Sequence, residues 1–548
     1  MASSTSVSLQ EYDAVVIGAG HNGLTCACYL ARAGLKTLVL EQYHSIGGMT
    51  ITEEITLPGF KSDIHAFGYQ LANLSPVPFE LGLDKNAFEL IQPEISYSHI
   101  YPEGGFISMH RGLDQTVKSI EKYSRKDGIT WKKMFEEYYS TKDSIISAIN
   151  NPPPPISSIL EGVDKNPDLF DKYRAGLQSM RSWTNEWFES EEVKVMFGSF
   201  AAFIGLSPDD AGGGEVSHLF STVMQDGGNN VVKGGFGNLP LALAKYLESK
   251  GGQIMTNSSV EKIVVDKEQG KAVAVKLENG KEIHVKKVVA SSTDPSTLVL
   301  KHLGEDYVEK RVIGRVKAME WGDAIMAIYL ALDEPVHYYA GNKVTKSAQI
   351  HLSDPSLDYL SKIYYECRSG KIPSEPLLIM SNDSVCDPTR VPAGKHLIKF
   401  LVLNVPYEIK YDIKNTTGEL KSTNRSDNRS DWNEIKEDYG DLIIDLITEK
   451  YMPELKKVIL KKVILSPTDF ELRPTTSIRG TLSCGAVLPY QISSSRPIPE
   501  LAGYKIPSIP NVYLCGSGNH PGPGVSMAPG RNAAQVILAD LEIDFDFP

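Results

Sequence analysis

The chain has 548 residues, a formal net charge of −12 at pH 7 and 41% hydrophobic residues. Its length allows about two or three domains with apolar cores, and its acidic balance excludes a protein that binds nucleic-acid phosphates through a basic face. No stretch reaches the roughly 18 consecutive apolar residues of a membrane span. Residues 1–10 carry neither a secretory nor a mitochondrial presequence, so we expect a cytoplasmic protein.

Residues 13–48 contain the most informative pattern of the chain. A strand is predicted at 14–17, a helix follows that ends near Gly34, and a second strand is predicted at 37–40. In the turn before the helix, the first glycine permits a tight bend, the second lets the backbone approach a pyrophosphate, and the third lets the helix pack on the strand. The N–H groups at the helix start meet the phosphate charge, so the pattern predicts a dinucleotide site. The turn reads Gly18, Ala19, Gly20, His21, Asn22 and Gly23.

Glu41 ends the second strand, where a carboxylate accepts hydrogen bonds from a ribose diol and disfavours the 2′-phosphate of NADP. A second diglycine, Gly47-Gly48, follows in the same segment. Bare backbone at this point favours FAD, because the chain must pass close to an extended cofactor. Gln42 and Met49 flank these residues and belong to the predicted FAD site.

The cysteine pattern argues against two other chemistries. The chain contains no C-x-x-C or C-x4-C pair, which excludes a flavin-linked dithiol reductase, and we expect no metal site. Small buried thiols in a reducing compartment are the simplest interpretation. The cysteines are Cys26, Cys28, Cys367, Cys386, Cys484 and Cys515.

A second segment is predicted to return to the cofactor at residues 231–290. A glycine-rich loop at 233–238 enters a helix at about 239–249, and Asn279-Gly280 suits the turn of a β-hairpin. The segment reads as a return into the first sheet with a small antiparallel insert, and the backbone of Val260 is expected near the adenine. Strands are predicted at 253–255, 259–265, 273–277, 283–285 and 288–290.

The third return lies near the end of the chain, where a strand from Asn511 leads into a glycine-rich loop and a helix at about 525–541. Such a loop lets the ribityl chain of a flavin lie against bare backbone. The helix start can direct its partial positive charge at the flavin N1/C2 edge, where negative charge appears on reduction. The predicted contacts here are Gly516, Asn519, Val525, Ser526 and Met527.

Together these motifs resemble the phytoene desaturase and carotenoid isomerase superfamily of FAD enzymes, nearest its phytoene-dehydrogenase-related (pyridine nucleotide-disulphide oxidoreductase domain-containing) branch. The resemblance spans nearly the whole chain and implies an α/β fold, with a Rossmann-type, amine-oxidase-like (GR2) FAD-binding domain and an interleaved α+β substrate domain. Met49-Thr50 replaces an arginine found in many relatives, and 483–485 lacks their His-Gly. The matching residues are 17–24, 46–48, 233–239, 466–469, 496–497 and 520–531.

The predicted FAD-binding domain is discontinuous, and the intervening chain is assigned to the substrate domain. The apolar segment 195–204 is a helix core or a tunnel wall, and 455–465 is a strand with solvated lysines or a contact with anionic lipid at a membrane surface. We assign 10–75, 225–310 and 506–545 to the FAD-binding domain and 76–224 and 311–505 to the substrate domain. Within the latter we expect helices at 113–123, 129–149 and 167–204, strands at 324–332 and 397–405, and a flexible insertion at 413–432.

Flavin N5 can accept a hydride from carbon, so the protein has chiefly to position the substrate and exclude water. The resemblance implies apolar, polyene or isoprenoid-like substrates that enter from a membrane. His65 and His520 are candidates for proton transfer or for structural roles, and Arg496 for steering flavin or substrate or for bracing a loop.

Three functions fit these observations. The first is an FAD-dependent dehydrogenase or desaturase that passes electrons to oxygen or a quinone. The second is a non-redox polyene cis–trans isomerase, and the third is a flavin-stabilised interaction protein. The sequence favours the first and leaves the oligomeric state open.

Overall fold

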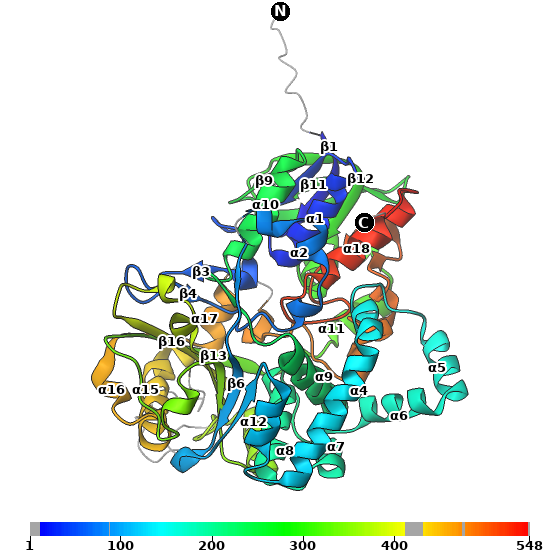
Figure 1. Ribbon diagram of the computed structural model, residues 1–548. Helices are drawn as coiled ribbons and strands as arrows, with labels where there is room; N and C mark the ends of the chain where they lie inside the picture. The colour runs from blue at the N-terminus through cyan, green and yellow to red at the C-terminus, as the bar shows by residue number, and fades with distance from the viewer. Residues whose placement is uncertain (1–10, 87, 411–430, 474–476, 546–548) are drawn as a thin grey trace, which may run out of the picture.

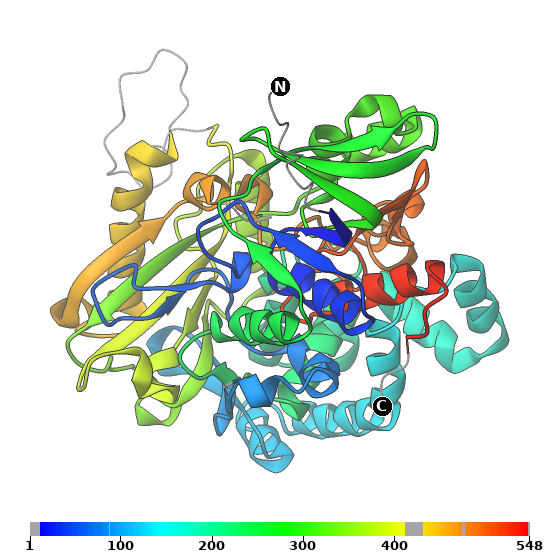
Figure 2. The ribbon, with the colours of Figure 1, turned by 90° about the horizontal axis from the view of Figure 1, so that it is seen from above.

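The computed structural model describes residues 11–86, 88–410, 431–473 and 477–545. Its described residues form two large β-sheets, one in the upper part of Figure 1 and one at the lower left, with helices packed around each. The view from above in Figure 2 shows that segments far apart in the sequence contribute to both.

The eight-stranded sheet has a parallel centre of Rossmann type with an antiparallel extension, which confirms the predicted α/β class. β1 (Glu11–Ile17) pairs in parallel with β2 (Thr37–Leu40) and β12 (Glu282–Ser291), and the outer parallel strands are β9 (Gln253–Met255) beside β2 and β19 (Ile509–Leu514) beside β12. The antiparallel strands are β10 (Val260–Asp266), β11 (Lys271–Leu277) and β18 (Lys505–Ile506).

The predicted strands at 283–285 and 288–290 are one strand, β12, so the predicted break between them is wrong. Its first residues pair antiparallel with β11, and its last residues pair in parallel with β1 and β19. Two exposed lysines interrupt the apolar run, and the register with β1 shifts there, since Tyr12 pairs with Val285 and Ala14 with Val288, but the strand continues. Lys286 Nζ lies 2.8 Å from the carboxylate of Glu11.

Helices cover one face of the parallel strands, while the antiparallel extension of β10 and β11 and a helical segment at Thr297–Leu303 pack on the other. α1 (His21–Arg32) packs between α10 (Asn238–Ser249) and α18 (Ala528–Asp540), which Figure 1 shows as neighbours. α18 begins three residues later than the predicted start at 525. Met527 has a left-handed backbone (φ 63°), which ends the loop there, and Pro529 suits the first helical turn.

The seven-stranded sheet is mixed, with one parallel pair between β14 and β6. Successive side chains along its strands point into two different hydrophobic cores, one on each face. One core lies against α15 (Trp432–Lys450), and the other lies against α8 (Glu191–Phe203) and α12 (Leu357–Ser369). The strand order is β17 (Ile459–Leu465), β13 (Ala324–Leu332), β16 (His396–Val405), β15 (Leu378–Ser381), β14 (Ser347–Leu352), β6 (Ile95–Ile100) and β7 (Phe106–His110).

The helix predicted over 167–204 is interrupted twice. Ser179 and Ser190 each begin a new helix by accepting a hydrogen bond from a backbone N–H three residues ahead, so the local capping chemistry overrides the continuous apolar pattern. α5 and α6 project from the body at the right of Figure 1. The helices of this region are α3 (Leu113–Ile120), α4 (Arg125–Ile149), α5 (Ile156–Lys165), α6 (Pro167–Leu177), α7 (Met180–Trp187), α8 and α9 (Gly213–Asp226).

Residues 455–465 form α16 (Leu455–Val458) and β17, and their lysines bind carboxylates of α15. Lys462 Nζ lies 2.6 Å from Asp441, which favours the strand with solvated lysines over the lipid contact. The predicted insertion at 413–432 lies outside the described residues, apart from Asp431 and Trp432. The shorter elements are α2 (Val77–Glu80), α13 (Asp383–Cys386), α17 (Pro467–Leu472), the pair β3 (Thr52–Glu53) and β4 (Ser62–Asp63), and the pair β5 (Leu90–Ile91) and β8 (Val231–Val232).

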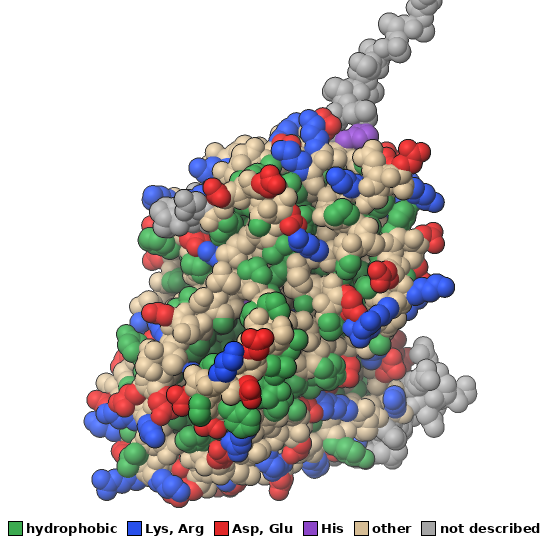
Figure 3. Space-filling model, turned by 90° about the vertical axis from the view of Figure 1, so that its right-hand side faces the viewer, with side chains coloured by type: hydrophobic (Ala, Val, Ile, Leu, Met, Phe, Trp, Pro, Cys, Tyr) green, Lys and Arg blue, Asp and Glu red, His purple; other side chains and the backbone are tan. Residues whose placement is uncertain are grey.

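The face drawn in Figure 3 carries both acidic and basic side chains, with hydrophobic side chains gathered in its lower centre. Among the described residues, no helix combines the length and hydropathy required to cross a membrane.

Candidate functional site

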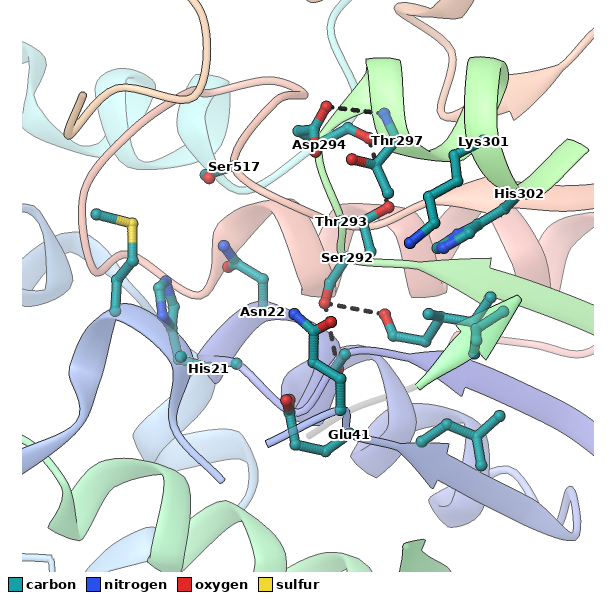
Figure 4. Close-up of a pocket in the computed structure, with 18 of the residues that line it drawn as sticks. His21, Asn22, Glu41, Ser292, Thr293, Asp294, Thr297, Lys301, His302 and Ser517 are labelled. Carbon is teal, nitrogen blue, oxygen red and sulfur yellow. Dashed lines mark hydrogen bonds between the residues drawn. The ribbon is translucent and has the colours of Figure 1, made fainter. Parts of the chain in front are cut away.

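A polar cavity of about 250 Å³ opens at the carboxyl ends of β1 and β12 (Figure 4). Parallel strands direct their following loops to this edge, where α/β proteins bind ligands. The glycine turn after β1 forms one side and residues 292–302 after β12 form the other. The lining residues are Ile17, Gly18, Gly20, His21, Asn22, Leu40, Glu41, Gln42, Gly48, Met49, Ser258, Val260, Ser292, Thr293, Asp294, Thr297, Lys301, His302, Ile478 and Ser517.

The three glycines of the turn have distinct steric roles. Gly18 has φ +95°, and a Cβ at Gly23 would lie 2.1 Å from the carbonyl oxygen of Gly18. A Cβ at Gly20 would meet no atom within 4 Å. The first and third glycines are therefore required by the fold itself, whereas the second leaves open space beside the cavity.

The second diglycine packs directly on this turn. Gly47 N donates a hydrogen bond to Ala19 O at 3.0 Å, and a Cβ at Gly48 would lie 3.3 Å from the Cα of Gly20. The two glycine motifs therefore form a single backbone surface, although a helix and a strand separate them in the sequence.

Glu41 is buried beneath the turn, and both of its carboxylate oxygens accept backbone hydrogen bonds. Oε2 accepts from Ala19 N at 2.8 Å and Oε1 from Tyr43 N at 2.9 Å. Burial raises the pKa of Glu41, against the effect of these hydrogen bonds. Each oxygen retains acceptor capacity for a ligand hydroxyl.

The segment after β12 supplies polar groups that were not among the predicted site residues. Ser292 Oγ hydrogen-bonds the carbonyl oxygens of Ile17 at 3.1 Å and Gly18 at 3.2 Å, which holds the glycine turn. Lys301 also lines the cavity, so a cation is present there although Met49 replaces the arginine found in many relatives (Figure 4). In the sequence, the run of polar residues directly after an apolar strand was the feature that could have identified this side of the cavity.

Two buried polar atoms in the cavity wall support binding of a polar ligand. His21 Nε2 and Asn22 Oδ1 have no hydrogen-bond partner among the described residues. Burial lowers the pKa of His21 to about 4, so its imidazole is neutral at pH 7. Unpaired buried polar atoms are costly, and a bound ligand would satisfy them.

A second, apolar cavity adjoins the first, and the two share His21, Met49 and Ser517. α8 contributes Phe203 to its wall, so the segment 195–204 serves both as helix core and as cavity wall. The complete lining is His21, Met49, His65, Ala66, Phe67, Gly68, Gln70, Leu71, Phe203, Ile204, Phe220, Leu482, Ser483, Ser517, Pro523, Gly524 and Val525.

The predicted cofactor residues divide into lining and framing groups. Ala19, Gly23 and Gly47 frame the turn, whereas Gly516, Asn519, Ser526 and Met527 lie in the loop before α18. A Cβ at Gly530 would lie 2.1 Å from Asn22 O, so the first turns of α18 and α1 are in contact. Those lining the polar cavity are Gly18, Gly20, Asn22, Glu41, Gln42, Gly48, Met49 and Val260, and Val525 lines the apolar one.

The two candidate histidines occupy different surroundings. His65 lines the apolar cavity, and neither ring nitrogen has a hydrogen-bond partner among the described residues. Burial and the positive charges of Arg473 and Lys399 lower the pKa of His65 to about 3. The Nε2 atom of His520 lies 2.8 Å from Ala148 O, and His520 lines neither cavity.

Arg496 is buried and braces a loop. Its guanidinium donates to the carbonyl oxygens of Ser483 at 2.9 Å and Ser517 at 3.1 Å, both of which line the apolar cavity. Burial lowers the pKa of Arg496 to about 10, which leaves it charged at neutral pH. The further carbonyl acceptors are those of Cys484, Gly485, Ala486 and Gln491.

The Rossmann-type sheet, with its glycine turn at the edge where the polar cavity opens, is the architecture of a dinucleotide-binding protein. Residues 23–387 match the family described as flavin containing amine oxidoreductase, and the chain belongs to this family. It is an FAD-dependent oxidoreductase, as the sequence predicted.

Curated relatives confirm the resemblance to the phytoene desaturase superfamily. The chain is 29% identical to pyridine nucleotide-disulfide oxidoreductase domain-containing protein 2 of Rattus norvegicus (97% of this chain, 94% of the relative). It is 26% identical to a limonene dehydrogenase subunit of Castellaniella defragrans (98% and 96%) and 25% identical to phytoene desaturase of Fusarium fujikuroi (96% and 89%). An oxidoreductase from Methanosarcina mazei has a similar fold, with a TM-score of 0.59 at 16% identity over 97% of this chain and 100% of that one.

Proposed function

We propose that the protein dehydrogenates an apolar, isoprenoid-like substrate by hydride transfer to flavin N5, and passes the electrons to oxygen or a quinone. The observation that carries the proposal is the apolar cavity that adjoins the polar dinucleotide cavity at His21, Met49 and Ser517. A cavity of this kind also argues against a protein that merely uses flavin for stability.

The polar cavity suits the adenosine and pyrophosphate parts of FAD. Glu41 would accept the ribose hydroxyls, the start of α1 and Lys301 would face the pyrophosphate, and Val260 would border the adenine. Gly516, Asn519 and Val525–Met527 would hold the flavin end. FAD supplies a two-electron hydride acceptor when bound.

The chain's own contribution is to position the substrate in a dry compartment. Phe67, Phe203 and Phe220 line it and exclude water. His65 stays neutral at pH 7, because its pKa is about 3. A carbon that has lost a hydride makes its neighbouring C–H strongly acidic, so a weakly basic imidazole is sufficient to take up that proton.

The names of two relatives support an apolar substrate. One is a subunit of limonene dehydrogenase and another a phytoene desaturase. Contact with a membrane surface remains part of this proposal, because an apolar substrate partitions into lipid.

An anaerobic titration of the purified holoprotein tests the proposal. A lipid extract of the source cells is added while the visible flavin absorbance is followed. Bleaching that is reversed by oxygen or a quinone is the expected result. A retained flavin that never bleaches would favour the polyene isomerase, and a protein that binds no flavin would overturn the assignment of the cavities.

A further inference from the structure

The apolar cavity contains one side-chain amide, that of Gln70, which is buried. An amide can present either its NH₂ group or its oxygen to a ligand, and these recognise opposite partners. Which of the two faces a substrate is decided by the hydrogen bonds behind Gln70.

A chain of buried hydrogen bonds runs from the backbone of α8 towards this amide. Ser199 Oγ donates to Met196 O at 2.8 Å, and a carbonyl oxygen can only accept. Ser199 Oγ also lies 2.8 Å from His351 Nδ1 and 3.0 Å from Tyr97 Oη.

The amide nitrogen of Gln349 lies 2.7 Å from His351 Nε2 and can only donate, so Nε2 accepts. Burial and the neighbouring His99 hold the pKa of His351 well below its ordinary value, so the ring is neutral and its single proton lies on Nδ1, facing Ser199 Oγ. This orients Gln349 with its nitrogen towards the histidine and its oxygen away from it.

The oxygen of Gln349 accepts from Gln70 Nε2 at 2.5 Å and from Asn229 Nδ2 at 3.2 Å. The nitrogen of Gln70 is thus committed to the protein interior. No described residue donates to Gln70 Oε1.

We propose that Gln70 Oε1 is a fixed acceptor that selects a substrate with one hydroxyl group on an otherwise hydrocarbon skeleton. The inference rests on the proposed function, because it requires the apolar cavity to be the substrate compartment. A pure hydrocarbon would leave this acceptor unsatisfied, which is unfavourable in an apolar cavity.

The surrounding charges select a neutral donor over a cationic one. Arg473 and Lys399 both act on His65, in the wall of the same cavity, with a positive potential. Such a potential opposes an ammonium group, which would also need a carboxylate partner. Gln70 therefore favours an alcohol over the corresponding amine.

Binding of saturated probes to the oxidised holoprotein tests this selection without turnover. p-Menthane and menthol share one skeleton and differ by a hydroxyl group, and their dissociation constants are read from the perturbed flavin spectrum. Wild-type protein is expected to bind menthol about three- to tenfold more tightly. In Gln70→Met, which keeps the side-chain length, this preference should disappear while binding of p-menthane is unchanged.

A further variant tests the charge. Gln70→Glu keeps an acceptor and adds a negative charge, so it should shift selectivity from menthol towards menthylamine.

Equal binding of menthol and p-menthane by the wild type, no binding of menthol, or a preference retained in Gln70→Met would each overturn the inference. The visible flavin absorbance separates this failure from failure of the proposed function. If the wild type contains flavin but does not prefer the alcohol, only the proposed role of Gln70 is wrong. If the wild type contains no flavin, the assignment of the site itself is wrong.

Discussion

The carboxylate of Glu41 accepts a hydrogen bond from the backbone amide of Ala19 at 2.8 Å. The acid at the end of β2 is thereby joined to the middle of the glycine turn that follows β1. The same side chain that faces a ribose in the proposed complex therefore also holds the turn that would receive the pyrophosphate.

Replacing Glu41 should weaken FAD binding for both reasons. We expect Glu41→Ala to lower FAD affinity by about tenfold to a hundredfold, which is the range for lost hydrogen bonds to a charged group. Reconstitution of the apoprotein with FAD, followed by flavin fluorescence, measures it. Asp306→Ala, at an exposed acid that does not line the cavity, is the control. Normal flavin content in Glu41→Ala would contradict the ribose assignment.

Gly20→Ala should separate binding from folding. Its Cβ would meet no atom within 4 Å, and its φ of −70° is accessible to alanine. The apoprotein should therefore unfold at an unchanged temperature, while FAD affinity falls because the methyl group occupies the space left for the pyrophosphate. Full FAD affinity in the Gly20→Ala variant would place the pyrophosphate elsewhere.

Gly23→Ala should instead destabilise the fold, because its Cβ would lie 2.1 Å from Gly18 O. We expect a loss of about 1–3 kcal/mol, the usual cost of overpacking. Gly314→Ala in α11 (Lys310–Lys317) is the matched control, since nothing lies within 4 Å of its Cβ position. That change should leave stability equal or raise it by up to about 1 kcal/mol. Similar melting temperatures for the two variants would contradict the close approach.

Lys301 should contribute to FAD binding mainly through charge. Its side chain is 58% exposed, so solvent screens the attraction between its ammonium group and the pyrophosphate. Lys301→Met is expected to weaken FAD affinity by up to about fivefold, and by less at high salt. Lys310→Met, on the exposed side of α11, should have no effect. If Lys301→Met bound FAD as tightly as the wild type at low salt, the proposed contact between Lys301 and the pyrophosphate would be wrong.

Stability should fall as the pH decreases from about 6.5 to 5, through histidines that stay neutral in the fold. The pKa values of His65 and His99 are about 3, against an ordinary value of 6.5. Below pH 6.5 the unfolded chain binds protons that the folded chain does not, so unfolding becomes more favourable as the pH falls. Each such histidine contributes about 1–2 kcal/mol over this interval.

Urea unfolding at pH 7 and pH 5 measures this effect, and His65→Phe should show a smaller difference between the two. Phenylalanine can pack against Phe470, whose ring centroid lies 4.9 Å from that of His65. An unchanged pH dependence in His65→Phe would show that His65 is protonated in the fold.

The sequence by itself determined the elements whose geometry is local. The strand, turn and helix from Glu11 to Arg32 are specified by an apolar run and by glycines at the required spacing, and β2 follows directly. These predictions succeeded because a tight turn and a helix end depend on neighbours in the chain. The predicted break in β12 failed, since exposed lysines within a strand look the same in the sequence as a loop.

Only the tertiary structure decided how the cavity walls meet. Ser292 reaches the glycine turn because β12 pairs with β1, and its hydrogen bond to Ile17 O joins positions 275 residues apart. The bond between His520 and Ala148 joins positions 372 residues apart. The orientation of the Gln70 amide depends on α8 and β14 together. A pattern read along the chain contains none of these distances, because they are set by which strands pair and which helices cover them.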